Sequence, residues 1–286
     1  MKFSTAAYVS LVALASSAVA APLSESNVKR AGPGKRGLVW TFYNGPLDPA
    51  KLNDRQGSVN LIYDYETFAP PSTNGAGGLN FIGMQRCLDC DSSPISQLAA
   101  RQKQVGFSTL FTLNEPDING ISPGQAAAWY KQNINPMPIK KALPAVTSST
   151  KPGQGLDWLK QMLDACAGQC FFDYINLHHY GKNFNEFKAH VLDANKRFPG
   201  KQIVITEFAL QAPPGGQADQ VAFYKQAFAF LDAAPFVAMY FPFLASTPSL
   251  FAKNDAAGAK FVGTGSTLYN DDGSVSAVGK LMSQKF

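Results

Sequence analysis

The sequence predicts an α/β fold, a (β/α)8 TIM barrel in a single domain. Eight short runs rich in apolar, β-branched and aromatic residues recur along the chain, roughly 20 to 35 residues apart. Segments with helical spacing of apolar residues lie between many of these runs. Strands that are apolar on both faces and alternate with helices are typical of a parallel sheet covered by helices. Eight such units in one domain are the number that a (β/α)8 barrel needs.

The eight runs place the predicted strands. The first four strands are expected at residues 37–43, 58–65, 79–85 and 107–113. The last four are expected at 139–146, 172–180, 201–208 and 236–243. An open doubly wound sheet is the main alternative. It usually carries a Gly-rich nucleotide fingerprint after the first strand, and "WTFYNGPLD" has no such pattern.

The predicted helices fill the gaps after the third strand. They are expected at residues 92–104, 122–134, 155–167, 183–198 and 216–234. Ser93-Pro94 and Ser122-Pro123 place a proline at a first helical position behind an N-cap serine. The first two gaps are shorter and rich in Gly and Pro, which favours loops. Residues 267–286 predict a turn followed by a final helix.

The N-terminus predicts a secreted protein. Residues 1–20 carry one early lysine and then an uncharged apolar stretch that ends in Ala-Val-Ala, as in a cleavable signal peptide. Residues 21–36 are small and polar and contain the dibasic pairs Lys29-Arg30 and Lys35-Arg36, which suggests a pro-segment trimmed by a dibasic protease. A solvated basic linker is the alternative interpretation. The catalytic domain is then expected at residues 37–286, in an extracellular or cell-wall-associated protein.

Removal of the leader changes the charge balance. The whole chain is formally +5, but without residues 1–36 it keeps 20 cations and 19 anions. A chain close to neutral gives no electrostatic reason to expect binding to nucleic acid or to a membrane surface. With 45% hydrophobic residues it can bury one large core, and we expect a monomer.

The four cysteines form two close pairs, Cys87 with Cys90 and Cys166 with Cys170. Such spacing is compatible with a zinc site or with disulfides, and the oxidising secretory route favours disulfides. Three pairings are open, of which we prefer the two local loops to the two crossed arrangements.

Two glutamates end strongly apolar runs and are the candidate catalytic residues. Glu115 follows the fourth predicted strand and Glu207 ends the seventh. Catalytic groups of a (β/α)8 barrel project from the C-terminal ends of its strands. Two carboxylates that meet there can hydrolyse a glycosidic bond, one as acid and one as nucleophile. Each glutamate alone could also be a solvated strand end or a helix cap.

The motifs "LFTLNEPD", "YINLHHYG" and "IVITEFAL", in this order, resemble the retaining (β/α)8 glycosidases with Asn-Glu on strand four and Glu on strand seven. The "HHYG" and "TEF" forms and the fungal-type leader resemble more narrowly glycoside hydrolase family 128. This family comprises β-1,3-glucanases and also includes fungal cell-wall proteins. The resemblance covers most of residues 37–286.

The resemblance implies roles for individual residues. Glu115 would be the general acid/base, Glu207 the nucleophile, and Asn114 a ligand of the sugar 2-hydroxyl. His178 and Tyr180 would face inward near the nucleophile, whereas His179 would pack behind its strand. Tyr180 could also simply cap the barrel core.

Aromatic residues near the predicted strand ends are candidates for stacking on sugar rings. Trp40, Tyr65 and Tyr240 are the candidate substrate-binding residues, although filling the core is the commoner role for any one aromatic side chain. Family members commonly end strand eight with a tryptophan, where this chain has "MYFPFL". We therefore expect an altered subsite near the cleavage point.

These observations predict a retaining hydrolase of β-1,3-glucan, with a glucan oligosaccharide or polysaccharide as partner. A non-hydrolytic β-glucan-binding or cell-wall protein on the same scaffold is the alternative, and a hydrolase of another polysaccharide is a weaker one. No cofactor is implied, because acid/base chemistry on an acetal needs none. The three histidines show no spacing typical of a metal site, so no metal is expected.

Overall fold

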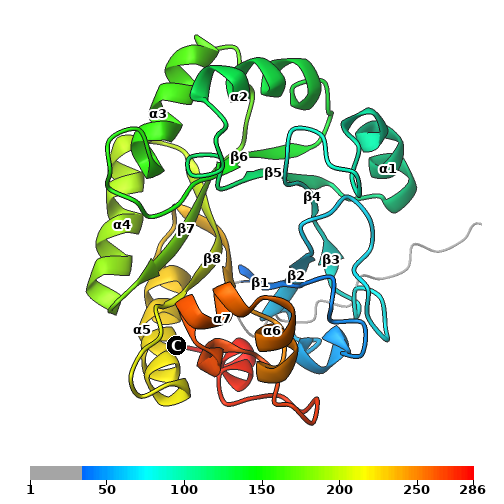
Figure 1. Ribbon diagram of the computed structural model, residues 1–286, viewed down its shortest axis with the longest axis vertical. Coiled ribbons are helices and arrows are strands. Elements are labelled where there is room, and N and C mark those ends of the chain that lie inside the picture. The colour runs from blue at the N-terminus through cyan, green and yellow to red at the C-terminus, as the bar shows by residue number, and fades with distance from the viewer. Residues whose placement is uncertain (1–33) are drawn as a thin grey trace, which may run out of the picture.

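A computed structural model describes residues 34–286, which form a nearly closed barrel of parallel strands surrounded by helices (Figure 1). The barrel begins with β1 (Arg36–Val39), β2 (Val59–Tyr63), β3 (Asn80–Phe81), β4 (Gly83–Gln85) and β5 (Thr109–Asn114). It continues with β6 (Lys140–Ala145), β7 (Tyr174–Gly181), β8 (Gln202–Leu210) and β9 (Val237–Pro242). The strand order is β3-β2-β1-β9-β8-β7-β6-β5-β4. The predicted (β/α)8 barrel is therefore confirmed.

The third predicted strand is divided in two, which explains why nine strands replace eight. β3 pairs with β2, β4 pairs with β5, and Ile82 separates them. The amide of Ile82 donates to Ile62 O at 2.9 Å, and the amide of Met84 donates to Glu66 O at 2.8 Å. The run 79–85 thus bonds to strands on both sides and closes the barrel.

The helices lie outside the strands. They are α1 (Leu98–Val105), α2 (Pro123–Trp129), α3 (Gly155–Cys166), α4 (Phe184–Arg197) and α5 (Gln217–Ala233), and they fall within the predicted segments or extend one residue beyond them. A single π-helical turn, Tyr130–Ile134, continues α2. Two short helices that the sequence did not predict, α6 (Pro248–Asn254) and α7 (Ala256–Val262), follow β9 and lie over the barrel opening (Figure 1).

The predicted final helix is wrong. Among residues 267–286 only the 3-10 turn Gly279–Ser283 is helical. The carbonyls of Leu281, Met282 and Gln284 accept hydrogen bonds from the Arg36 guanidinium instead of continuing a helix. Long-range contacts with the first strand therefore decide the conformation of the tail.

Arg36 lies one residue before the predicted start of the catalytic domain. It is the first residue of β1 and is 1% exposed. Its guanidinium forms an ion pair with Asp232 and donates to the hydroxyl of Tyr240 at 2.7 Å. The ammonium of Lys35 donates to three carbonyls at the end of α5, including Ala234 O at 2.7 Å. The pair Lys35-Arg36 belongs to the barrel, whereas residues 1–20 and the pair Lys29-Arg30 lie outside the described residues.

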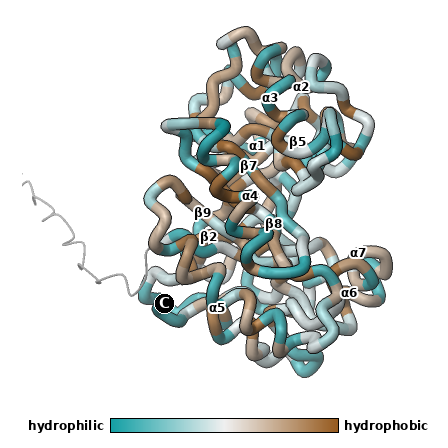
Figure 2. Tube along the Cα trace, turned by 90° about the vertical axis from the view of Figure 1, so that its left-hand side faces the viewer, coloured by the Kyte–Doolittle hydropathy of each residue, from teal (hydrophilic) through white to brown (hydrophobic). Residues whose placement is uncertain are grey.

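Aromatic rings fill the barrel interior. Tyr63, Phe111 and Phe241 are fully buried and meet edge to face, with ring centroids 5.2 to 5.6 Å apart. Gly37 is needed beside them, because any Cβ at that position would overlap the ring of Phe241. Hydrophobic residues follow the strands and the inward sides of the helices, as Figure 2 shows. No helix within residues 34–286 is long and apolar enough to cross a membrane.

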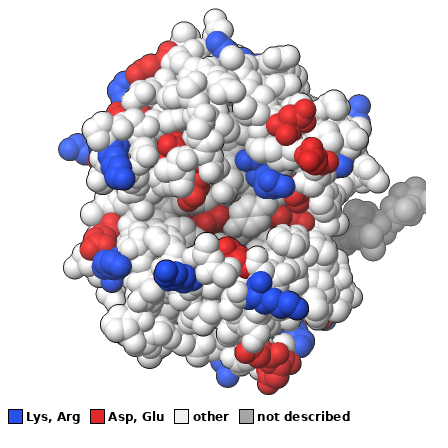
Figure 3. Space-filling view, viewed as in Figure 1, with Lys and Arg blue, Asp and Glu red and all other residues white. Residues whose placement is uncertain are grey.

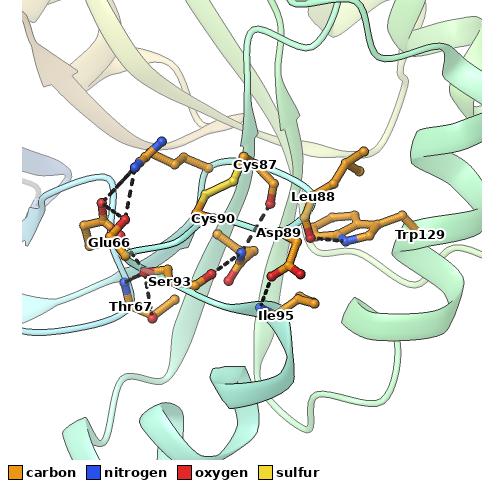
Figure 4. Close-up of a disulfide and its surroundings, with 12 residues drawn as sticks. Glu66, Thr67, Cys87, Leu88, Asp89, Cys90, Ser93, Ile95 and Trp129 are labelled. Atoms are coloured by element: carbon orange, nitrogen blue, oxygen red, sulfur yellow. Dashed lines mark hydrogen bonds and ion pairs between the residues drawn. A yellow bond between two sulfur atoms is a disulfide. The ribbon is translucent and has the colours of Figure 1, made fainter.

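The cysteines form the two local disulfides, Cys87–Cys90 and Cys166–Cys170, so this preferred pairing is confirmed. The first disulfide closes the loop after β4 (Figure 4). That loop contacts Glu66, whose carboxylate accepts hydrogen bonds from Arg86 at 3.2 Å and from Ser92 at 2.7 Å. Arg86 and Ser92, on either side of the disulfide, therefore contact Glu66 at one side of the barrel opening.

Candidate active site

Glu115 lies directly after β5 with φ at +48°, a left-handed conformation that is unusual for a residue with a side chain. Its amide donates to Ala145 O on β6 at 2.8 Å, which holds this turn. Asp117 fixes the loop that follows, because its carboxylate accepts hydrogen bonds from the amides of Thr147 and Gly155. The strained turn is therefore supported from two neighbouring segments, as is common at functional sites.

Glu207 lies in β8 and its side chain is 8% exposed. Tyr65 donates to its Oε1 at 2.6 Å, and Tyr180 donates to its Oε2 at 2.6 Å. Like Glu115, Tyr65 has a positive φ, +67°. Two hydroxyl donors on one carboxylate stabilise its ionised form and fix its orientation.

His178 lies between the two glutamates. Its Nδ1 is 2.9 Å from Glu115 Oε1 and 3.4 Å from Glu207 Oε2, and its side chain is fully buried. Its Nε2 is 2.9 Å from Thr206 Oγ1 on β8, so both ring nitrogens have hydrogen-bond partners. The imidazole on β7 is thus held in one orientation by Glu115, directly after β5, and by Thr206 on β8.

The two glutamates lie close together. One carboxylate oxygen of each, together with His178 Nδ1, lies within 4.8 Å of the others. The same three atoms could bind a cation, but both oxygens of Glu207 already accept tyrosine hydrogen bonds. The cluster is therefore satisfied by protein groups, and the absence of a metal from the reaction stays a prediction.

Burial and neighbouring charges shift the pKa values of this cluster. Burial raises the pKa of Glu207 above its usual 4.5; His178 opposes the rise, Glu115 adds to it, and the tyrosine hydrogen bonds oppose it. Burial works against protonation of His178, but the two glutamates outweigh it and raise the pKa of His178 above 6.5. Burial and the charge on Glu207 raise the pKa values of Tyr65 and Tyr180 well above 10, which keeps both hydroxyls protonated as donors.

Two cavities flank this cluster at the barrel opening. The larger one, of about 810 Å³, is lined by Glu115, Glu207 and Tyr180. The smaller one, of about 620 Å³, is lined by Tyr65 and by residues of the β1 and β2 ends. The two cavities share Phe243 and Asp255, so they meet beside the glutamates. Acidic side chains gather in the central hollow of this face (Figure 3).

Four of the predicted substrate-binding residues lie at this site. Tyr65, His178 and Tyr180 contact the glutamates directly, as described above. Asn114 precedes Glu115 at the end of β5, and its Oδ1 is buried with no hydrogen-bond partner in residues 34–286. His179 packs behind β7 as expected, with its ring 5.4 Å from that of Phe187.

Trp40 and Tyr240 are wrong as substrate-binding candidates. Trp40 is fully buried, and its Nε1 donates to Pro71 O at 2.9 Å. Tyr240 is also fully buried, and its hydroxyl contacts Arg36 and Asp232 near the start of β1, at the opposite end of the barrel from the glutamates. Neither ring can stack on a sugar in this arrangement.

Three aromatic residues at the barrel opening were not predicted to bind substrate. Phe243 follows β9 directly and lines both cavities. Phe42 is 73% exposed beside the smaller cavity, and Phe261 is 49% exposed beside the larger one. An aromatic residue just after a strand, as in "WTFY", was the available signal for Phe42; Phe261 lies in a helix that was not predicted.

Known proteins are similar to this chain in sequence and in architecture. A family model described as the glycosyl hydrolase catalytic core matches residues 37–282. The structure of a glycoside hydrolase family 128 (subgroup IV) endo-β-1,3-glucanase from Lentinula edodes is 57% identical, covers 88% of this chain and 100% of its own, and superposes with a TM-score of 0.85.

More distant relatives are also similar to this chain in sequence and, where a structure is known, in fold. The structure of a curdlan-specific exo-β-1,3-glucanase of the same family (subgroup III) from Blastomyces gilchristii, in complex with glucose, is 26% identical. It covers 89% of this chain and 100% of its own, with a TM-score of 0.68. Alkali-sensitive linkage protein 1 of Schizosaccharomyces pombe is 27% identical over 259 residues, or 87% of this chain. The chain spans 44% of the length of that relative.

Proposed function

Because the chain belongs to the glycosyl hydrolase catalytic core family, and within it to glycoside hydrolase family 128, we propose that it is a retaining hydrolase of β-1,3-glucan. The observation that carries this proposal is the arrangement of the two glutamates. One oxygen of each carboxylate lies within 4.8 Å of the other, a close approach that suits the roughly 5 to 5.5 Å separation of the carboxyl groups in retaining enzymes. The relatives named above supply the substrate class.

The surroundings of the two carboxylates support different roles. Glu207 is buried and held by two tyrosine hydroxyls, which favours an ionised, oriented nucleophile. Glu115 is 20% exposed, opens onto the larger cavity and shares a hydrogen bond with His178. Glu115 is thus placed to exchange protons with a leaving group, as a general acid/base must.

The reaction then proceeds by two displacements. Glu207 attacks the anomeric carbon while Glu115 donates a proton to the departing glycosidic oxygen, which leaves a covalent glycosyl-enzyme. Glu115 next removes a proton from water, which attacks the same carbon and releases Glu207. The sugar keeps its β configuration. The unpartnered Oδ1 of Asn114 is available to accept a hydrogen bond from the sugar 2-hydroxyl.

The two cavities support endo action. The larger cavity is lined by both glutamates, and the smaller one adjoins it at Phe243 and Asp255. A glucan chain that runs through both cavities would therefore pass across the glutamates. An exo-acting site would need one side to be closed. The exposed rings of Phe42 and Phe261 offer an apolar surface at each end of this groove.

We also propose that the protein is secreted, acts as a monomer and starts its folded domain at Arg36. The leader sequence at residues 1–20 and the two disulfides suit an oxidising extracytoplasmic compartment.

Hydrolysis of laminarin tests the proposed function. The wild-type protein should release products whose reducing ends are β-anomers when first observed by NMR. Glu115→Gln and Glu207→Gln should each lower kcat by at least about 100-fold, whereas the exposed Glu186→Gln on α4 should not change it. Products that appear as α-anomers would contradict retention, and full activity of either active-site variant would contradict the catalytic roles.

Phe243 is the observation that favours the alternative function. It provides a smaller ring than tryptophan at the meeting point of the two cavities, so the chain could bind β-glucan without cleaving it. Retention of insoluble β-1,3-glucan with no soluble product from the wild type would establish this alternative.

A further inference from the structure

A chain of buried polar groups runs from the barrel interior to Glu115. Asn176 and His178 lie two residues apart on β7, so their side chains share one face of the strand. Thr206 on β8 links them, because its hydroxyl oxygen lies 2.8 Å from Asn176 Oδ1 and 2.9 Å from His178 Nε2. Asn176, His178 and Thr206 are all fully buried. The two displacements proposed above use neither Asn176 nor Thr206.

An irregularity in β8 places Thr206 beside the imidazole. Leu177 of β7 pairs with Ile205 of β8. The next residue, His178, pairs with Glu207, so Thr206 is an extra residue in β8. Successive residues of a regular strand point to opposite faces, whereas Thr206 and Glu207 both approach His178, at 2.9 Å and 3.4 Å. A bulge of this kind redirects a side chain and is common next to active sites.

The atoms in this chain fix the direction of each hydrogen bond. The oxygen of an asparagine amide can only accept, so the single proton of the Thr206 hydroxyl goes to Asn176 Oδ1. Thr206 Oγ1 then accepts from the imidazole, which requires a proton on His178 Nε2. Asn176 Nδ2 is buried and has no hydrogen-bond partner in residues 34–286. Such an unpaired group is uncommon, and here it accompanies an amide that turns its oxygen toward Thr206.

A proton on Nε2 determines what Nδ1 of His178 can do. A neutral imidazole carries a proton on only one ring nitrogen, so Nδ1 is then an acceptor and can bind protonated Glu115 Oε1. In the charged imidazole, Nδ1 donates to the ionised carboxylate across the same 2.9 Å. The Glu115–His178 pair therefore holds one mobile proton between Oε1 and Nδ1. Its movement between these two atoms changes neither the charge of the pair nor its number of protons.

Neighbouring charges favour the retention of that proton. Burial works against a charged His178, but the carboxylates of Glu207, Glu115 and Asp117 outweigh it and raise the pKa of His178 above 6.5. The tyrosines around the pair stay uncharged, because burial raises their pKa values well above 10; they are Tyr63, Tyr65 and Tyr180. The carboxylates thus hold a proton in the site, and the Thr206–Asn176 contact selects the ring nitrogen that carries it.

We propose that Thr206 and Asn176 are positioning residues that hold a proton on His178 Nε2 and so keep the mobile proton of the Glu115–His178 pair available to the general acid. The proposal rests on the proposed function, which gives Glu115 this role, and it adds two residues that act on Glu115 through His178. Without the Thr206 acceptor, the buried Nε2–H group loses its partner, and the pair should release its proton at a lower pH.

Nitrogen NMR of protein labelled in its histidine rings measures the tautomer without any substrate. Burial lowers the pKa values of His179 and His190 to about 3 and about 4, so of the three histidines in the chain only His178 should change charge near neutral pH. Nε2 of His178 should stay protonated while Nδ1 loses its proton. Thr206→Val should lower the pKa of His178 by about one unit or more, and Thr206→Ser, which keeps the hydroxyl, should restore it.

The pH profile of kcat/KM for laminarin measures the effect on the reaction. Thr206→Val should move the basic limb to lower pH by about one unit, through kcat more than KM, and Thr206→Ser should return it to the wild-type position. Thr112→Val is the matched control, because Thr112 is equally buried and its hydroxyl donates to a backbone carbonyl, that of Ala142, at 3.0 Å. This control should lower stability and leave the limb in place.

Asn176→Leu tests the same chain of hydrogen bonds from its other end. With Oδ1 removed, the Thr206 hydroxyl can donate to His178 Nε2, so the neutral imidazole should carry its proton on Nδ1. Thermal unfolding identifies any variant that fails to fold, and the tautomer of the wild type is measured in every case.

A wild-type His178 whose neutral form carries its proton on Nδ1 would overturn the proposal. A folded Thr206→Val variant with the wild-type pKa of His178 and the wild-type basic limb would also overturn it. Failure of the proposed function is a different result, because then the wild type would release no product from laminarin. The NMR measurement would still decide whether Thr206 and Asn176 hold the proton on Nε2.

Discussion

Removing the hydroxyl of Tyr65 should move the acid limb of the pH profile to higher pH. This hydroxyl donates to Glu207 Oε1 at 2.6 Å in a buried site. A hydrogen bond to a charged group contributes about 1.5 to 3 kcal/mol to the ionised form. Since about 1.4 kcal/mol corresponds to one pKa unit, Tyr65→Phe should raise the pKa of Glu207 by about one unit or more.

The direction follows from the role of Glu207. A nucleophile must be ionised, so activity falls as the pH drops through the pKa of Glu207, which already lies above 4.5. A further rise in that pKa moves the fall in activity to higher pH. We expect Tyr65→Phe to lose about 10-fold in kcat/KM on the acid side of the wild-type profile and less at its optimum.

The assay is kcat/KM for laminarin between pH 3.5 and 8. Tyr180→Phe should behave similarly, because its hydroxyl donates to the other oxygen of Glu207 at 2.6 Å. Tyr174→Phe is the control, since it lies at the far end of β7 from Tyr180. An acid limb in Tyr65→Phe that coincides with that of the wild type would refute the role of this hydroxyl.

Three further predictions concern stability and metals. Burial lowers the pKa of His179 to about 3, so this side chain alone should cost the folded protein about 1.4 kcal/mol per pH unit as the pH falls from 6.5 toward 3. His179→Gln should remove this contribution to the pH dependence of stability in urea denaturation. Replacing Cys87 and Cys90 by serine should cost about 2 kcal/mol of stability and raise KM for laminarin, because their loop borders the smaller cavity. Replacing Cys166 and Cys170 should cost as much stability with no change in KM, because the end of α3 lies away from the barrel opening. Dialysis against a chelator should leave laminarin hydrolysis unchanged, and activity restored by an added divalent cation would contradict this.

The same feature of the sequence, its strongly apolar runs, predicted both the barrel and the two glutamates as candidate catalytic residues. Each strand is apolar on both faces, so a charged residue at the end of such a run stands out. Glu115 follows β5 directly and Glu207 lies in the second half of β8, which continues to Leu210, and parallel strands in a barrel bring these C-terminal halves to the same opening. The pattern along the chain therefore contains most of the information about the proposed catalytic pair.

The aromatic residues that line the groove were harder to predict because their orientation depends on contacts distant in sequence. Trp40 and Phe42 are two residues apart, yet Trp40 is buried against Tyr269 near the C-terminus and Phe42 is exposed. That Asp64 Oδ2 has no hydrogen-bond partner in residues 34–286 likewise depends on the surrounding fold, and the string "YDYE" does not contain that information. The sequence indicated that aromatic side chains line the groove, while the fold determined which aromatic residues they are.

The burial of Arg36 has a consequence for the proposed maturation of the protein. A protease that cut after the pair Lys35-Arg36 would remove the cation that joins the start of the barrel to Asp232 and to three carbonyls of the C-terminal tail. Both basic side chains are engaged with the barrel, so the folded protein shields this dibasic pair. The mature N-terminus should therefore lie upstream of residue 35, and the folded barrel itself sets how far trimming can go.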